Sequence, residues 1–163
     1  MAADIFIVTA EMDPESQEWL GGLRRQHYPR DRNSVPAHLT LFHRAVLANV
    51  ETVTLISLPK RPLPLTFSGL RHLGYGVAVE VLAPELKTLR QAIVEKFGYV
   101  SKQDPQTWRP HVTIQDKVSG RAARALYNQL AETYVAREGT ANGLAVWEYR
   151  GGPWSLHKTF EFQ

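Results

Sequence analysis

The alternation of apolar and polar side chains predicts short strands separated by amphipathic helices. Residues 4–10 form an apolar, β-branched run that is typical of a buried strand. Asp13 is a suitable N-cap and Pro14 a suitable first residue for a helix over residues 14–27. A polar loop then leads into a second strand, over residues 37–43. The first quarter of the chain therefore predicts a strand–helix–strand unit.

The same order begins again in the second half of the chain. Pro84 opens a helix that ends at Gly98, and a polar loop leads from this helix into a strand over residues 111–115. The remaining predicted elements are a helix over 50–57 capped by Asn49, strands over 65–73 and 77–82, a helix from 119 or 120 to 135, and strands over 144–149 and 155–162.

Two four-residue segments of the predicted strands repeat one another. Residues 38–41 read His-Leu-Thr-Leu and residues 111–114 read His-Val-Thr-Ile. In a strand the histidine and threonine of each segment share one face, because successive side chains point to opposite sides. The two histidines are 73 residues apart, close to half of the 163-residue chain. An internal duplication is the simplest explanation.

The duplication predicts an α+β fold in which two lobes of antiparallel sheet, related by a pseudo-twofold axis, surround a central cleft. The long helices are expected to pack on the outer faces. The length of the chain is that of one domain. We therefore expect a single domain made of lobes over about residues 1–73 and 74–163, with some exchange of strands between them.

The amino-acid composition excludes some kinds of site and favours one kind of ligand. The chain has no cysteine, which excludes disulfides and thiolate metal sites. A net charge of +3 and a pI of about 9.3 suit a ligand that carries phosphate, such as a nucleotide or an RNA end. No apolar run approaches the roughly 18 residues of a membrane span, and the first residues do not resemble a signal peptide. A cytoplasmic monomer without membrane partners is expected.

The repeated histidines and threonines are suited to chemistry at phosphorus. An imidazole has a pKa of about 6.5, so one of two rings in a cleft can accept a proton while the other donates one. Threonine hydroxyls can donate hydrogen bonds to phosphoryl oxygens between the rings. In-line displacement on such a site needs neither a metal nor another cofactor. The residues leave open which histidine is the base, with a preference for His111 in hydrolysis.

The two segments, together with Arg109 and Pro110 before the second, resemble the paired signatures of the two-histidine phosphoesterase superfamily. The resemblance is to its 2'-5' RNA ligase-like branch and spans nearly the whole chain. It implies metal-independent chemistry at 2',3'-cyclic or 2'-5' phosphodiester bonds of nucleotides or RNA ends, with reversible 2'-5' RNA ligation as a related activity. It also implies that His38 and His111 are the acid/base pair and that Thr40 and Thr113 bind the phosphate. The chain leaves little room for an added RNA-binding element.

Five further residues are candidate substrate contacts. Tyr28 and Trp108 lie in the polar loops that precede the two His-x-Thr strands, where an aromatic ring could stack on a base. Phe42 falls on the histidine face if the strand alternates regularly. Arg109 and Lys117 flank the second strand and could bind a phosphate.

For the other histidines and aromatic residues, the sequence favours a structural role over a role in the site. His43 is predicted to face away from His38, because the two are an odd number of positions apart. Arg71 and His72 are expected in a solvated loop at the end of a strand, although they could reach the rim of the cleft. Trp154, with Trp147, is expected in the core.

Two other function classes remain open. A non-catalytic module could hold a nucleotide or an RNA end in the same cleft, although binding alone does not require two proton carriers. A metal-dependent hydrolase could use His38, His43, His111 and Asp116, although the predicted orientation of His43 disfavours it.

Overall fold

A computed structural model describes residues 5–45, 50–51, 53, 56–97 and 107–163. The predicted cap Asn49 and the predicted helix end Gly98 lie outside the described residues, as do three residues of the helix predicted over 50–57. The described elements are β1 (Ile5–Met12), α1 (Pro14–His27), the 3₁₀ helix η1 (Arg30–Arg32), β2 (Leu39–Ala45), β3 (Leu63–His72), β4 (Val77–Leu82), α3 (Pro84–Phe97), β5 (His111–Gln115), α4 (Gly120–Ala131), β6 (Arg137–Tyr149) and β7 (Ser155–Glu161).

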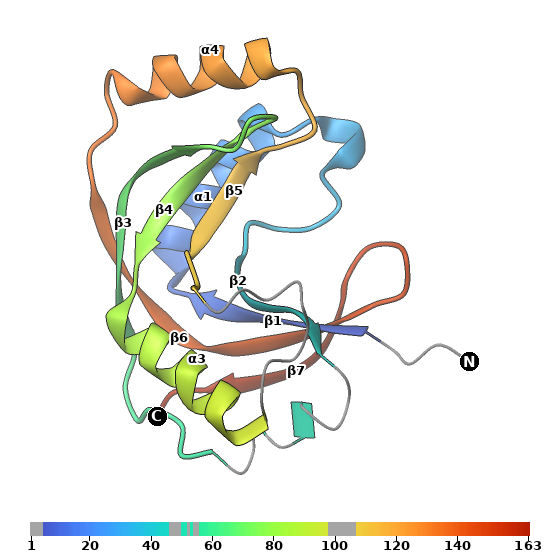
Figure 1. The fold of residues 1–163 in the computed structure, drawn as a ribbon, viewed down its shortest axis with the longest axis vertical. Coiled ribbons are helices and arrows are strands. Elements are labelled where there is room, and N and C mark those ends of the chain that lie inside the picture. The colour runs from blue at the N-terminus through green and yellow to red at the C-terminus, as the bar shows by residue number, and fades with distance from the viewer. Residues whose placement is uncertain (1–4, 46–49, 52, 54–55, 98–106) are drawn as a thin grey trace.

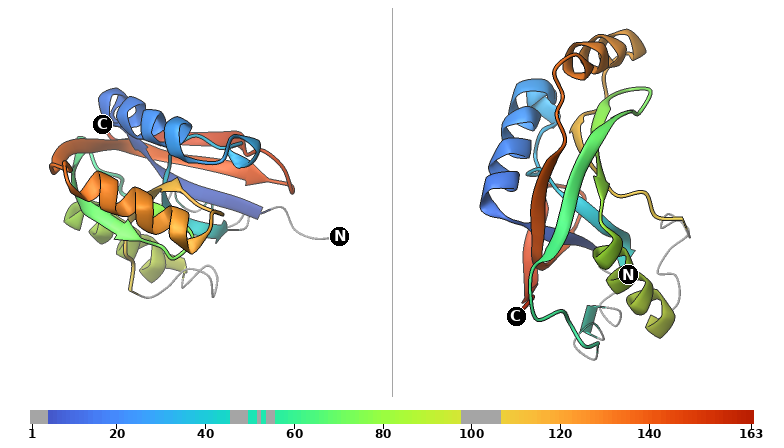
Figure 2. Two further views of the ribbon diagram at one scale, coloured as in Figure 1. Left: turned by 90° about the horizontal axis from the view of Figure 1, so that it is seen from above. Right: turned by 90° about the vertical axis from the view of Figure 1, so that its left-hand side faces the viewer.

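The strands form one sheet in the order β2-β1-β6-β3-β4-β5, with β7 paired to β6. Every strand pair is antiparallel, and the sheet curls into a half-barrel (Figures 1 and 2). The predicted α+β class is therefore confirmed. The strands that carry the His-x-Thr segments, β2 and β5, lie at opposite ends of this order.

The sheet order mixes strands from the two predicted halves of the chain. The units β1-α1-β2 and β4-α3-β5 have the same order of elements. The third strand beside each unit comes from the other half, because β6 pairs with β1 and β3 pairs with β4. The division into two lobes stays a prediction.

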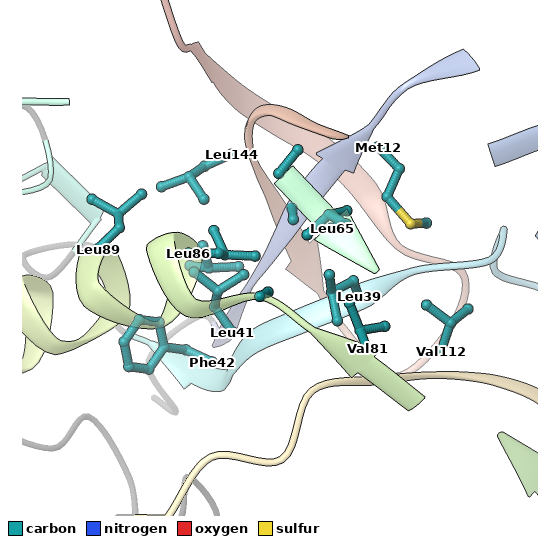
Figure 3. Close-up of a cluster of buried hydrophobic side chains, with 14 of the residues drawn as sticks. Met12, Leu39, Leu41, Phe42, Leu65, Val81, Leu86, Leu89, Val112 and Leu144 are labelled. Carbon is teal, nitrogen blue, oxygen red and sulfur yellow. The ribbon is translucent and has the colours of Figure 1, made fainter. Parts of the chain in front are cut away.

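The three α-helices labelled in Figure 1 pack on different parts of the sheet: α1 contacts β5 and β6, α3 contacts β3, and α4 contacts β3 and β4. Side chains from α3 and from several strands meet in one hydrophobic core (Figure 3). Burying apolar surface in this way is the main force that holds the curled sheet together. Among the described helices none is both long and apolar enough to cross a membrane.

The structure corrects the predicted bounds in the last third of the chain. Helix α4 ends at Ala131 rather than at residue 135, and β6 begins at Arg137 rather than at residue 144. The segment 137–143 is polar and glycine-rich, so its sequence does not favour a strand. It forms one because it pairs with both β1 and β3. Gly143 is needed there, because a Cβ atom would collide with the Phe160 carbonyl of β7.

Candidate active site

The curl of the sheet brings its two end strands, β2 and β5, into contact (Figure 1). The indole N–H of Trp108, three residues before His111, donates a hydrogen bond to the Thr40 carbonyl at 3.1 Å. A single side chain thus connects the approach to the second His-x-Thr segment with the backbone of the first. The two segments that are far apart in sequence lie side by side in the fold.

Both histidines are held by the same backbone contact. The His38 Nδ1 atom lies 2.8 Å from the Pro36 carbonyl, and the His111 Nδ1 atom lies 2.9 Å from the Arg109 carbonyl. A carbonyl only accepts hydrogen bonds, so each Nδ1 carries the hydrogen and each Nε2 has a lone pair. In both rings Nε2 is therefore the atom able to take up a proton.

Burial lowers the pKa of His38 to about 4, aided by the charge of Arg24 and opposed by the hydrogen bond to the Pro36 carbonyl. Burial also lowers the pKa of His111, with Arg71 acting in the same direction. Both imidazoles are therefore neutral in the ligand-free protein at pH 7. The two rings are close enough for the charge of one to act on the other.

The predicted phosphate ligands lie two residues after each histidine. The pairing of β4 with β5 is regular from His111 to Thr113, so these two side chains share a face, as predicted. Thr40 lies opposite Thr9 of β1, and both Thr40 and Thr113 are half-buried. Their hydroxyl groups are thus neither packed into the core nor fully solvated.

A β-bulge in β2 corrects two predictions. Val8 of β1 pairs with Phe42, but the next residue, Thr9, pairs with Thr40, so β2 contains one extra residue at this point. The bulge places Phe42 in the core, where it is 1% exposed and lies near α3 (Figure 3). Phe42 is therefore not on the histidine face, and its predicted contact with substrate is wrong.

The same bulge reverses the orientation of His43. This side chain is exposed and lines the same pocket as His38, rather than facing away from it. The geometric reason given above against a three-histidine metal site is thus wrong. Within the described residues, however, no three His, Asp or Glu side chains are grouped in a way that could hold a metal ion.

An ion-pair cluster surrounds His111. The Glu80 carboxylate accepts hydrogen bonds from Arg71 at 2.8 Å and from Arg109 at 3.0 Å. The Nη1 atom of Arg71 lies 3.2 Å from the His111 Nδ1 atom. Because that Nδ1 already donates to the Arg109 carbonyl, Arg71 acts on the ring through its charge.

The position of Arg71 also corrects the sequence-based reading. It lies within β3 beside His111 and not in a solvated loop, and the sequence contained no signal of its partner 40 residues away. The neighbouring His72 is turned to the other face of the sheet, where the centroids of its ring and the Tyr127 ring of α4 are 5.9 Å apart.

The predicted aromatic contacts have different surroundings. Trp108 is almost fully buried and belongs to the core. Tyr28 lines the same pocket as His38, and the Arg24 guanidinium lies 4.0 Å from the centroid of its ring. Trp154 was expected in the core but lies on the turn between β6 and β7. Its ring packs against the His38 ring at a centroid distance of 4.6 Å. Trp154 is therefore in direct contact with a candidate catalytic group.

A pocket of about 550 Å³ opens beside His38. This volume lies within the range of small-molecule sites. We call it the His38 pocket. Its walls come from β1, α1, η1, β2, β6 and the connections after α1, η1, β5 and β6. Its lining includes Arg24, Tyr28, Arg32, His38, His43, Arg44, Asp116, Lys117, Tyr149 and Trp154.

The buried Arg24 links the parts of this site. Its Nε atom donates to the Asn33 side chain at 2.9 Å and to the Val35 carbonyl at 3.0 Å, just before His38. Its Nη1 atom donates to the Thr113 carbonyl at 2.9 Å. Helix α1 thus fixes the approach to one His-x-Thr segment and the backbone of the other.

A second buried arginine makes the reciprocal connection from the other half. Arg90 of α3 donates to the Leu41 carbonyl of β2 at 3.1 Å and is 2% exposed. Each helix of the repeated units therefore reaches across to the His-x-Thr strand of the other unit. Sequence reasoning missed both arginines, because a single basic residue on an amphipathic helix looks like a solvated one.

The lowered pKa values predict a pH-dependent stability. In the folded protein His38 stays neutral down to about pH 4. In the unfolded chain the same imidazole has its ordinary pKa of 6.5 and takes up a proton below that pH. The unfolded state binds more protons between these values, so the free energy of unfolding should fall as the pH drops through this window, by about 1–3 kcal/mol. Urea unfolding at pH 7.5 and pH 5 measures this loss. It should be smaller in His38→Gln, and an equal loss in both proteins would contradict the assignment to His38.

Comparison with known proteins points to one family. A model described as the 2'-5' RNA ligase superfamily matches residues 12–153. No curated protein matches the sequence. The structure is similar to that of TT0787 from Thermus thermophilus, with a TM-score of 0.63, 14% identity and 97% of each chain covered. It is also similar to E. coli LigT crystallised with 3'-AMP, with a TM-score of 0.60, 16% identity and 99% of each chain covered. At these identities the structures show a common fold.

Proposed function

Because this chain belongs to the 2'-5' RNA ligase superfamily, we propose that it is a phosphodiesterase acting on 2',3'-cyclic or 2'-5' phosphodiester bonds of nucleotides or RNA ends. The chemistry uses no metal. When an RNA 5'-hydroxyl attacks the 2',3'-cyclic phosphate in place of water and the 3'-oxygen leaves, a 2'-5' bond forms, and this reversible transesterification is the related ligase activity. The observation that carries the proposal is the matched pair of imidazoles. Each has Nδ1 tied to a backbone carbonyl and Nε2 left as a proton acceptor, on strands that meet.

In hydrolysis of a 2',3'-cyclic phosphate, the reacting phosphorus lies between the two Nε2 atoms. One imidazole removes a proton from the attacking water while the other, as imidazolium, donates a proton to the leaving ribose oxygen. The hydroxyl groups of Thr40 and Thr113 donate hydrogen bonds to the phosphoryl oxygens, where negative charge develops. The product is a phosphomonoester with a free neighbouring hydroxyl.

The surroundings of the two rings favour a division of roles. The base must be neutral before reaction, and His38 has the lower pKa because of its burial. The acid must carry a proton, and the anionic phosphate between the rings favours protonation of the ring that gains a proton more easily. We therefore assign His38 as the base and His111 as the acid in hydrolysis. This is the reverse of the preference drawn from the sequence.

A substrate screen tests the proposal. Purified protein is incubated with the four nucleoside 2',3'-cyclic phosphates and with 2'-5' and 3'-5' dinucleotides, with and without EDTA, and the products are identified by chromatography. We expect hydrolysis of the cyclic phosphates or the 2'-5' bonds to a single phosphomonoester isomer, with the rate unchanged by EDTA. Loss of activity in EDTA that Zn²⁺ or Mn²⁺ restores would reject the metal-independent mechanism. Tight binding without turnover would instead favour a non-catalytic nucleotide-binding module.

A further inference from the structure

The His38 pocket carries more positive charge than one phosphodiester requires. Four basic side chains (Arg24, Arg32, Arg44 and Lys117) and a single carboxylate, Asp116, line it, a net charge of +3 with the histidines neutral. This equals the formal net charge of the whole chain. A cyclic phosphodiester has one negative charge, and the histidines and threonines already serve it. The remaining charge suits a second anionic group.

Three of the four basic residues have their charged groups available in the pocket. Arg24 is committed to backbone carbonyls, whereas the one ion pair of Arg32 within the described residues is a 4.0 Å contact with the exposed Asp31. For Arg44 and Lys117, the described residues provide no ion pair to the side chain. These three cations come from η1, from β2 and from the connection between β5 and α4. They converge on one pocket from separate elements, unlike a run of charges along one exposed face.

The backbone of Lys117 is an independent observation. Its φ angle is 62°, and it is the one non-glycine residue with positive φ among the described residues. A lysine in this left-handed conformation is less favourable than a glycine. The Asp116 carboxylate caps the Lys117 N–H at 2.8 Å and helps to hold the turn. Strain of this kind is concentrated at functional sites, and here it carries an amine to the rim of the pocket.

The pocket also has room for a nucleoside beside His38. Trp154 packs on His38 at one wall, and the partly exposed Tyr149 and the ring of Tyr28 complete an aromatic lining. Aromatic rings of this kind stack on bases without requiring a particular sequence. The volume of about 550 Å³ exceeds what a phosphate alone would fill.

We propose that Arg32, Arg44 and Lys117 form a second phosphate site, which binds a phosphate one nucleoside away from the reacting phosphorus. The substrate is then a nucleotide or RNA end with a 5'-phosphate group or a 5'-neighbouring phosphodiester, rather than a simple nucleoside cyclic phosphate. The inference rests on the proposed function only in placing the reacting phosphate between His38 and His111.

Binding of stable product analogues tests the second site without requiring turnover. Isothermal titration calorimetry compares adenosine 3'-monophosphate, adenosine 3',5'-bisphosphate and the dinucleotide adenylyl-(3'→5')-adenosine 3'-phosphate. We expect at least one of the two ligands with the additional phosphate to bind tenfold or more tightly than the monophosphate, because charge-assisted hydrogen bonds to phosphate are strong. A preference for the bisphosphate identifies a terminal 5'-phosphate, and a preference for the dinucleotide alone identifies an internal diester.

The variant Lys117→Gly separates binding from folding. Glycine accepts positive φ, so the melting temperature should not fall, while the preference for the additional phosphate should drop to about threefold or less. Lys60→Gly removes the same charge at a bend outside this pocket and should keep the wild-type preference. Equal affinity of the wild-type protein for all three ligands, or a preference that survives Lys117→Gly and Arg44→Ala, would overturn the second site. A preference for the additional phosphate together with a negative substrate screen would reject the proposed function but keep this site.

Discussion

Replacing either His38 or His111 by alanine is expected to lower the turnover number by about 10²–10⁴, because each variant removes one of the two proton carriers. The reaction needs both proton transfers in one step, so the two residues act as a unit. The turnover number of the double variant should therefore be only slightly lower than that of the less active single variant. Steady-state kinetics on the best substrate of the screen measure all three rates.

The control for this experiment is His157→Gln on β7, which changes an exposed histidine outside the His38 pocket and should leave turnover unchanged. Circular dichroism and thermal unfolding show whether the variants are folded. Full activity in both folded single variants would remove the proposed chemistry. Activity lost in one variant alone would limit the mechanism to a single proton carrier and reject the paired roles.

Replacing Arg24 by methionine is expected to lower the free energy of unfolding by about 3 kcal/mol or more. Arg24 as a whole is 4% exposed, and its guanidinium donates hydrogen bonds to the carbonyls of Val35 and Thr113 and to the side chain of Asn33. Removing it leaves buried acceptors without donors, and each unsatisfied group costs about 1–3 kcal/mol. Urea unfolding followed by intrinsic fluorescence measures the change.

The neighbouring Arg25 supplies a matched control on the same helix. Its side chain is 63% exposed and its ion pair with Glu18 is solvated, so Arg25→Met should cost less than about 1 kcal/mol. Arg24→Lys keeps the charge but not the planar set of donors, and we expect it to fold with a lower turnover number because the loop before His38 shifts. Equal stability of Arg24→Met and Arg25→Met would show that Arg24 does not link the two halves of the site.

The positions of the elements and the two candidate histidines follow from local sequence patterns. Apolar spacing and the Pro14 and Pro84 starts predict α1 and α3, and the His-x-Thr segments predict β2 and β5. These signals are local, because a period of two or of 3.6 residues is set by the geometry of a single strand or helix. The shared face of His111 and Thr113 could be predicted for the same reason.

Orientation beyond a few residues could not be predicted in this way. One extra residue in β2 moves Phe42 into the core and turns His43 toward His38, and no sequence signal marks this bulge. A single insertion into a strand reverses the face of every residue that follows it. A second register shift lies between Phe42 and Ala45, and after it Arg44 lines the His38 pocket and Ala45 is buried, as regular alternation predicts. Within β2 the predicted faces were therefore wrong for Phe42 and His43 alone.

The sequence by itself predicted two units with the same order of elements, β1-α1-β2 and β4-α3-β5, each ending in a His-x-Thr strand. Only the tertiary structure decided what surrounds those side chains. The curl of the sheet joins its two end strands, and Arg24 and Arg90 cross between the halves. Arg71 and Trp154 come to lie against the imidazoles. These contacts depend on pairing and packing between residues 40 or more positions apart, which no local period encodes.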